Sequence, residues 1–89
     1  MDNIYFVVYI LYSKTFDKTY VGFTQNLINR FQSHNKLGTK GYTLRYRPWE
    51  VLHLEFFDNK KDAMLKEKYF KSGAGRNHIK QLKSFYLQN

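Results

Sequence analysis

Three apolar stretches of this chain have the residue types and lengths of β-strands. The first, Ile4 to Tyr12, is an unbroken run rich in β-branched and aromatic residues, which predicts a central strand covered on both faces. Its odd-numbered residues would lie on one face and its even-numbered residues on the other. A polar connection, Ser13 to Lys18, leads to a short second strand, Thr19 to Gly22, so a hairpin is predicted. A third strand is predicted from Trp49 to Phe57.

The third stretch alternates apolar and polar residues, as a strand with one buried face does. The alternation places Leu52, Leu54 and Phe56 on the core face and sends His53 and Glu55 the other way. His53 has no metal-ligand spacing to another histidine or to a carboxylate, so it is predicted to be a surface residue.

The segment after the second strand has a helical period. Leu27, Ile28 and Phe31 make an apolar stripe, and Thr24 is a plausible N-cap, so a helix is predicted from there to about Asn35. The two glycines and two lysines that follow predict a loop over residues 36–41.

Two more helices are predicted after the third strand. One runs from about Lys60 to Lys71, and Gly73 and Gly75 are expected to break it. The last runs from about Arg76 to Phe85. The element order ββα-β-αα predicts a single α+β domain over residues 1–89, with a three-stranded, mostly antiparallel sheet flanked by helices.

The most informative feature of the composition is its excess of positive charge. Fifteen Lys and Arg against seven Asp and Glu give a formal charge of +8, which favours a nucleic-acid partner over generic solubility or a membrane surface. The sequence has no cysteine, which excludes disulfides and thiolate metal sites. The first apolar run is far shorter than the roughly 18–20 residues of a membrane span and no targeting signal is visible, so we expect a cytoplasmic protein with no membrane partner.

The carboxylate of Glu67 is the most informative polar group in the sequence. A helical period of about 100° gathers one mostly apolar face, made of Ala63, Met64, Glu67, Phe70 and Lys71. A carboxylate on such a face needs a partner or a function, because burying it unpaired is costly. An ion pair with a buried cation and a ligand role toward a hard divalent cation such as Mg²⁺ are equally compatible with the pattern.

Two further pairs of residues, one on the first helix and one on the hairpin, are weak indicators of function when each pair is taken alone. Arg30 and His34 are an i, i+4 pair beside the first helix's apolar stripe, where they could contact a phosphate or lie on a solvated flank. Tyr9 and Tyr20 lie on the two strands of the predicted hairpin, where tyrosines usually serve packing.

These residues occur in the order and at the spacings of a known family. The chain resembles the GIY-YIG nuclease family, and more closely its small stand-alone bacterial members, over about residues 5 to 82. The matching positions are Val7-Val8-Tyr9, Tyr20-Val21-Gly22 after ten further residues, Arg30, His34 and Glu67. The first motif departs from the family pattern by reading Val-Val-Tyr, and its tyrosine is retained.

The resemblance implies single-metal hydrolysis of a nucleic-acid phosphodiester, with DNA favoured over RNA and the choice between them left open by the sequence. We expect little sequence specificity. It implies that Tyr9 and Tyr20 line the site, and that Arg30 contacts the scissile phosphate. It further implies that His34 assists nearby and that Glu67 holds one divalent ion, Mg²⁺ or Mn²⁺. A role in DNA repair or processing would follow.

Basic and aromatic residues in and just after the predicted loop over residues 36–41 are expected to bind the nucleic acid, together with one lysine of a later helix. These residues are Lys40, Tyr42, Arg45, Arg47 and, in the later helix, Lys71. Two alternatives to a nuclease remain: a nucleic-acid-binding module of the same fold without turnover, and a small basic protein-interaction domain.

Overall fold

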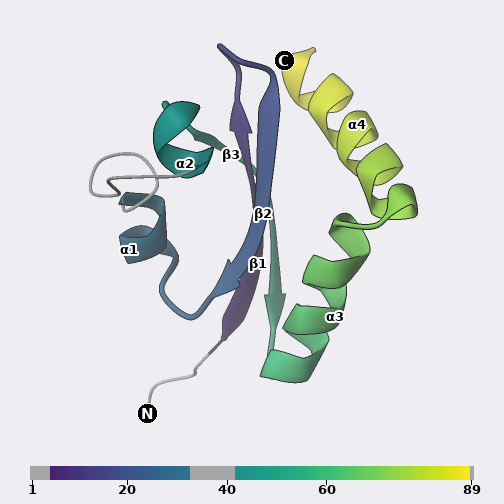
Figure 1. Ribbon diagram of the computed structural model, residues 1–89. Helices are drawn as coiled ribbons and strands as arrows, with labels where there is room; N and C mark the ends of the chain where they lie inside the picture. The colour runs from purple at the N-terminus through teal and green to yellow at the C-terminus, as the bar shows by residue number, and fades with distance from the viewer. Residues whose placement is uncertain (1–4, 33–41, 89) are drawn as a thin grey trace.

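The fold is a three-layer arrangement with a β-sheet between two pairs of helices (Figure 1). The computed structural model describes residues 5–32 and 42–88. Its elements are β1 (Phe6–Ser13), β2 (Lys18–Thr24), α1 (Leu27–Gln32), α2 (Tyr42–Arg45), β3 (Glu50–Phe57), α3 (Lys60–Phe70) and α4 (Gly73–Leu87). Within these ranges no helix is long and apolar enough to cross a membrane.

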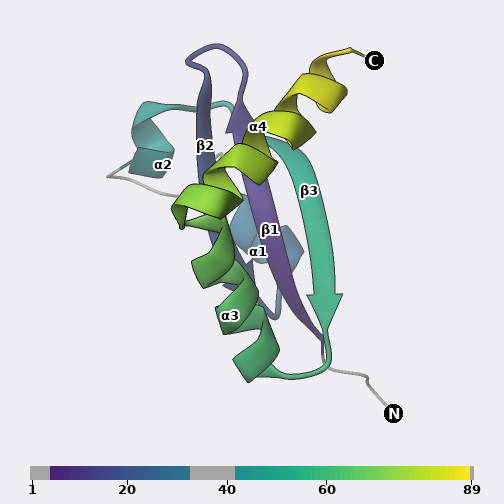
Figure 2. The same ribbon diagram turned by 90° about the vertical axis from the view of Figure 1, so that its right-hand side faces the viewer.

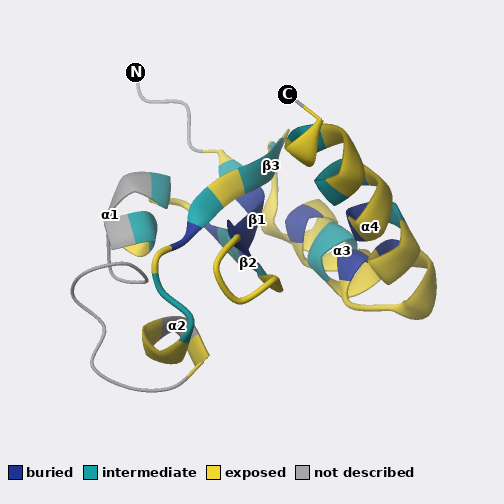
Figure 3. Ribbon diagram, turned by 90° about the horizontal axis from the view of Figure 1, so that it is seen from above, coloured by how far each residue is buried: buried dark blue, intermediate teal, exposed yellow. Residues whose placement is uncertain are grey.

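The sheet is antiparallel throughout and has the order β2-β1-β3, so the long apolar run of the sequence forms its centre. The helices α3 and α4 cover one face, where α4 crosses the strands at a slant (Figure 2). The helices α1 and α2 lie against the other face (Figure 3). The observed α+β architecture confirms the predicted fold class.

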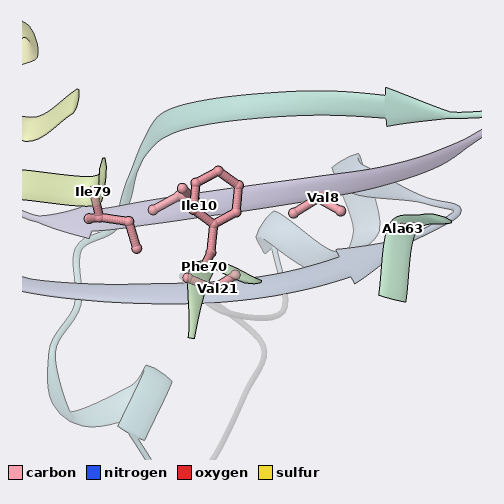
Figure 4. Packing of buried hydrophobic residues seen from close by; sticks show 6 residues of the cluster. All are labelled: Val8, Ile10, Val21, Ala63, Phe70 and Ile79. Atoms are coloured by element: carbon pink, nitrogen blue, oxygen red, sulfur yellow. The ribbon is translucent and has the colours of Figure 1, made fainter. Parts of the chain in front are cut away.

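Two hydrophobic clusters, one on each face of the sheet, form the core. Under α3 and α4 the buried residues are Val8, Ile10, Val21, Ala63, Phe70 and Ile79 (Figure 4). On the opposite face they are Tyr9, Leu11 and Trp49, with Leu27 and Phe31 of α1 packed against them. The odd–even division predicted for the first strand is therefore confirmed.

The hairpin between β1 and β2 closes through Asp17. Its backbone has φ 53°, a left-handed conformation that aspartate tolerates better than most residues. Its carboxylate accepts hydrogen bonds from Tyr12 (3.1 Å) and from Lys83 of α4 (2.9 Å). This contact ties the C-terminal helix to the tip of the hairpin.

The last helix begins earlier than predicted, at Gly73 instead of Arg76. The Ser72 side chain caps it by accepting a hydrogen bond from the Gly75 N–H (3.3 Å). Gly75 is buried, and a β-carbon there would lie 2.6 Å from the Tyr69 carbonyl carbon. The glycines therefore do not simply break a helix, because one of them permits the end of α3 and the start of α4 to touch.

The third strand also differs from its predicted alternation. The pairing of β1 with β3 shifts register and leaves Leu52 without a partner. Leu52 and Leu54 consequently pack on opposite clusters, and Phe56 is 62% exposed. The prediction for His53 was wrong as well, since its half-buried ring lies 5.8 Å from the ring of Phe70.

The observed helices differ from the predicted ones in three smaller respects. The first helix begins at Leu27, so the capping position is Asn26, whose N–H donates to the Thr24 hydroxyl (3.0 Å). The short helix α2 lies between the predicted loop and the third strand, where the predicted element order has no helix. On α3, Met64 is 48% exposed although the helical period placed it on the apolar face. The predicted end of the first helix at Asn35 lies outside the described residues.

Candidate functional site

Gly22 allows a buried tyrosine to reach across the edge strand of the sheet. Tyr9 on β1 pairs with Gly22 on β2, so the two lie side by side in the register. A β-carbon at Gly22 would lie 2.6 Å from Cζ of the Tyr9 ring. The absence of a side chain on Gly22 therefore makes room for the Tyr9 phenol over β2, an outer strand of the sheet.

Tyr20 is placed next to this phenol by the same strand. Its ring stacks with that of Tyr9, with centroids 6.3 Å apart and an angle of 24° between the planes. Tyr20 also meets Trp49 edge-on at 6.3 Å, which fixes the pair against the buried cluster on this face. The two tyrosines predicted as site residues thus form one aromatic unit.

Two further predicted residues, Arg30 and Glu67, influence the pKa of the Tyr9 phenol. Burial raises the pKa of the Tyr9 phenol, which is only 2% exposed, and the negative charge that Tyr20 or Glu67 can carry raises this pKa further. The guanidinium of Arg30 lowers it. Arg30 belongs to α1 on one face of the sheet and Glu67 to α3 on the other, so both act on Tyr9 across the edge of β2.

Glu67 has an ion-pair partner that leaves it available to a ligand. Its Oε2 lies 3.4 Å from the Lys71 Nζ one helical turn later. The Lys71 side chain is 57% exposed and the Glu67 side chain 23%, so the pair is not a buried one. An exposed lysine moves away from a carboxylate at little cost, because such pairs contribute only about 0.3–0.5 kcal/mol.

A single carboxylate fits Mg²⁺ or Mn²⁺ but not a cation that needs a full protein cage. The described residues contain no group of three or more His, Cys, Asp or Glu side chains that could hold a metal. Mg²⁺ is commonly held by one or two carboxylates together with water and substrate phosphate oxygens. The partly exposed carboxylate of Glu67 has the donor chemistry for this mode.

The predicted nucleic-acid-binding residues separate into two groups. Tyr42 and Lys71 both line a hollow of about 330 Å³ that adjoins β2. Arg45 instead holds its guanidinium 5.5 Å from the Tyr46 ring. Arg47 is half-buried in the connection to β3. His34 and Lys40 lie outside the described residues.

Sequence reasoning missed two features of this site. Gly22 was counted as part of a strand motif, although its lack of a side chain is what admits Tyr9. Arg76 was taken as the start of a helix, and it lines the same hollow as Lys71. The signal for Gly22 was the glycine inside an otherwise β-branched strand, which often marks a close approach of another group.

Comparison with known proteins identifies the family of this chain. A family model described as the GIY-YIG catalytic domain matches residues 5–81. A UPF0213 protein of Pediococcus pentosaceus is 45% identical over 64 residues, which is 72% of this chain and 67% of that protein. A UPF0213 protein of Clostridium perfringens is 39% identical over 84% of this chain and 78% of its own length.

A solved structure extends the likeness to the fold. The solution NMR structure of a UPF0213 protein from Bacillus halodurans has a TM-score of 0.54 and 26% sequence identity, covering 90% of this chain and 86% of that one. The family match spans the strand that carries Tyr9, the edge strand with Gly22 and the helix that carries Glu67. The chain therefore belongs to the GIY-YIG catalytic domain family, a family of nucleases.

Proposed function

We propose that this chain is a metal-dependent nuclease that hydrolyses a phosphodiester of nucleic acid, with DNA as the expected substrate and little sequence preference of its own. The observation that supports the proposal is the stacked pair of Tyr9 and Tyr20 beside Gly22, with a buried phenol that feels two opposite charges. Tyr9 and Tyr20 stack there, while Arg30 and Glu67 act on the same phenol from opposite faces of the sheet. A purely structural pair of tyrosines would need neither charge.

Each side chain has a role that its surroundings support. The exposed Arg30 can clamp the phosphate and stabilise charge that develops on its oxygens. The Tyr9 phenol, whose pKa burial raises above its ordinary value of 10.0, would donate a hydrogen bond to a phosphate oxygen or to the attacking water. Glu67 would hold one divalent cation, which when bound supplies Lewis-acid activation of the phosphodiester.

A binding module of the same fold without turnover is the alternative. The contact between Lys71 and Glu67 favours it to a degree, since the lysine neutralises the carboxylate on a surface meant for phosphates. The two functions differ in metal-dependent cleavage, because only the nuclease cuts its substrate and needs a divalent cation to do so.

The decisive experiment incubates the purified protein with Mg²⁺ or Mn²⁺ and a panel of single-stranded, duplex and branched DNA, and with RNA of the same sequence. We expect cleavage that a chelator abolishes. Arg30→Ala should lower the rate by about 10²-fold or more, and Arg30→Lys should restore little, since a point charge does not replace the two-pronged guanidinium. Lys61→Ala is the matched control, because it removes an exposed cation that lines a different hollow, with Met64 and Leu65. Binding of every substrate with no cleavage of any would favour the binding module.

A further inference from the structure

A hollow wraps around the edge of β2 beside the candidate site. It measures about 330 Å³ and adjoins strand, helix and loop at once. Its lining residues are Thr19, Tyr20 and Val21 of β2, Tyr42 of α2, Phe70 and Lys71 of α3, and Arg76 and Ile79 of α4. Ligand sites in proteins begin at about this size, and Tyr20 belongs both to the hollow and to the stacked pair with Tyr9.

One wall of the hollow is cationic. Lys71 follows the last residue of α3 and contacts Glu67, and Arg76 lies in the first turn of α4. Gly75 places Arg76 close to Lys71, because a glycine, which has no side chain, lets α4 start in contact with the end of α3. None of the described residues that line the hollow is acidic, so the wall favours an anion.

The opposite wall is an aromatic ring held in place. The Tyr42 hydroxyl donates to the Thr19 carbonyl oxygen at 3.0 Å, on the edge strand. The ring stacks on buried Trp49 with centroids 5.8 Å apart and an angle of 25°. Tyr42 is nevertheless 43% exposed, which leaves part of the fixed ring available for contact. An aromatic surface beside cations is the combination that binds a nucleotide unit.

We propose that this hollow binds the nucleotide next to the scissile one, with its phosphate on Lys71 and Arg76 and its sugar or base against Tyr42. The proposal rests on the nuclease function inferred above and names how that site holds the strand. The Lys71 Nζ lies 3.4 Å from the Glu67 Oε2, so the cationic wall of the hollow directly adjoins the proposed metal ligand. The subsite would orient the strand so that the neighbouring phosphodiester lies over Arg30 and Glu67.

The first test measures binding without catalysis. A thymidine dinucleotide with a 5′-phosphate is titrated into ¹⁵N-labelled protein in the presence of a chelator, with thymidine and inorganic phosphate as separate probes. We expect the largest amide shifts at Tyr20, Lys71 and Arg76 with the dinucleotide, and weaker binding of each fragment. Arg76→Ala should weaken dinucleotide binding about three- to tenfold, and Lys61→Ala should not change it.

The second test uses salt dependence and cleavage. Binding of a labelled twelve-residue oligothymidylate should show a salt slope lower by about one in Arg76→Ala than in the wild type. Shifts that map away from the hollow, or equal dinucleotide affinity in Arg76→Ala and the wild type, would overturn the subsite even if the wild type cleaves DNA. Loss of binding in Arg76→Ala supports the subsite, and failure of the wild type to cleave any substrate then counts against the nuclease alone.

Discussion

Replacing Glu67 with Gln separates a metal-binding carboxylate from a structural ion pair. The substitution keeps the size of the side chain and removes its charge. If Glu67 neutralised a buried cation, the substitution would leave that cation unpaired at a cost of about 3–5 kcal/mol. The Glu67 partner is instead Lys71, at 3.4 Å, whose side chain is 57% exposed. The lost interaction is then an ordinary helical i, i+4 pair of about 0.3–0.5 kcal/mol.

The expected stability change is therefore small. Removing a charge from a side chain that is 23% exposed also relieves some desolvation, which offsets part of that loss. For a domain of this size 1 kcal/mol corresponds to about 4–8 °C in Tm, so the Glu67→Gln variant should melt within about 4 °C of the wild type. A buried pair would instead lower the Tm by more than about 12 °C.

The assay is thermal melting of both proteins with a chelator, with Mg²⁺ and with Mn²⁺, together with DNA cleavage. We expect the wild type to gain Tm with the metals, since a ligand that binds only the folded state stabilises it. Glu67→Gln should lose that gain and all cleavage while keeping its metal-free Tm. In the metal-free melting experiment Lys71→Met is the matched control for the ion pair, because it removes the partner and leaves the carboxylate. A large fall in the metal-free Tm of Glu67→Gln, with no metal effect in the wild type, would refute the assignment of Glu67 as the metal ligand.

Three further predictions concern Gly22, the pKa of Tyr9 and the binding of DNA. Gly22→Ala should destabilise the fold by about 1–3 kcal/mol and reduce cleavage, because the new β-carbon would overlap the Tyr9 ring. Urea titration measures the loss against Gly73→Ala as the control. A β-carbon at Gly73 meets nothing within 4 Å, so that variant should be as stable as the wild type or more stable. Burial raises the pKa of Tyr9 above its ordinary value of 10.0, so the unfolded chain releases this proton first. The contribution of Tyr9 to the free energy of unfolding is thus intact below about pH 10 and falls above it by up to about 1.4 kcal/mol per pH unit. Urea titrations between pH 9 and 11 should show that Tyr9→Phe lacks this part of the alkaline decline. The affinity for DNA in a chelator should fall steeply as salt rises, given the net charge of +8, and an affinity independent of ionic strength would remove the electrostatic case for a polyanion.

Local patterns in the sequence determined the elements and their faces. The alternation in the first apolar run correctly divided Val8 and Ile10 from Tyr9 and Leu11, because side chains on a strand have a fixed period of two residues. The period of the later helix placed a carboxylate near the middle of a mostly apolar face, and Glu67 is half-buried in the structure. Such features depend on neighbours a few residues apart, and the sequence displays them directly.

Only the tertiary structure decided where the chemistry gathers. Arg30 and Glu67 lie on helices that cover opposite faces of the sheet, yet the charges of both influence the pKa of the Tyr9 phenol, which Gly22 admits over the outer strand β2. The role proposed for Arg76 likewise depends on how closely α4 approaches α3 at Gly75. Which strand lies at an edge, and how near two helices come, are set by packing between residues distant in the chain, and no short-range period in the sequence records that packing.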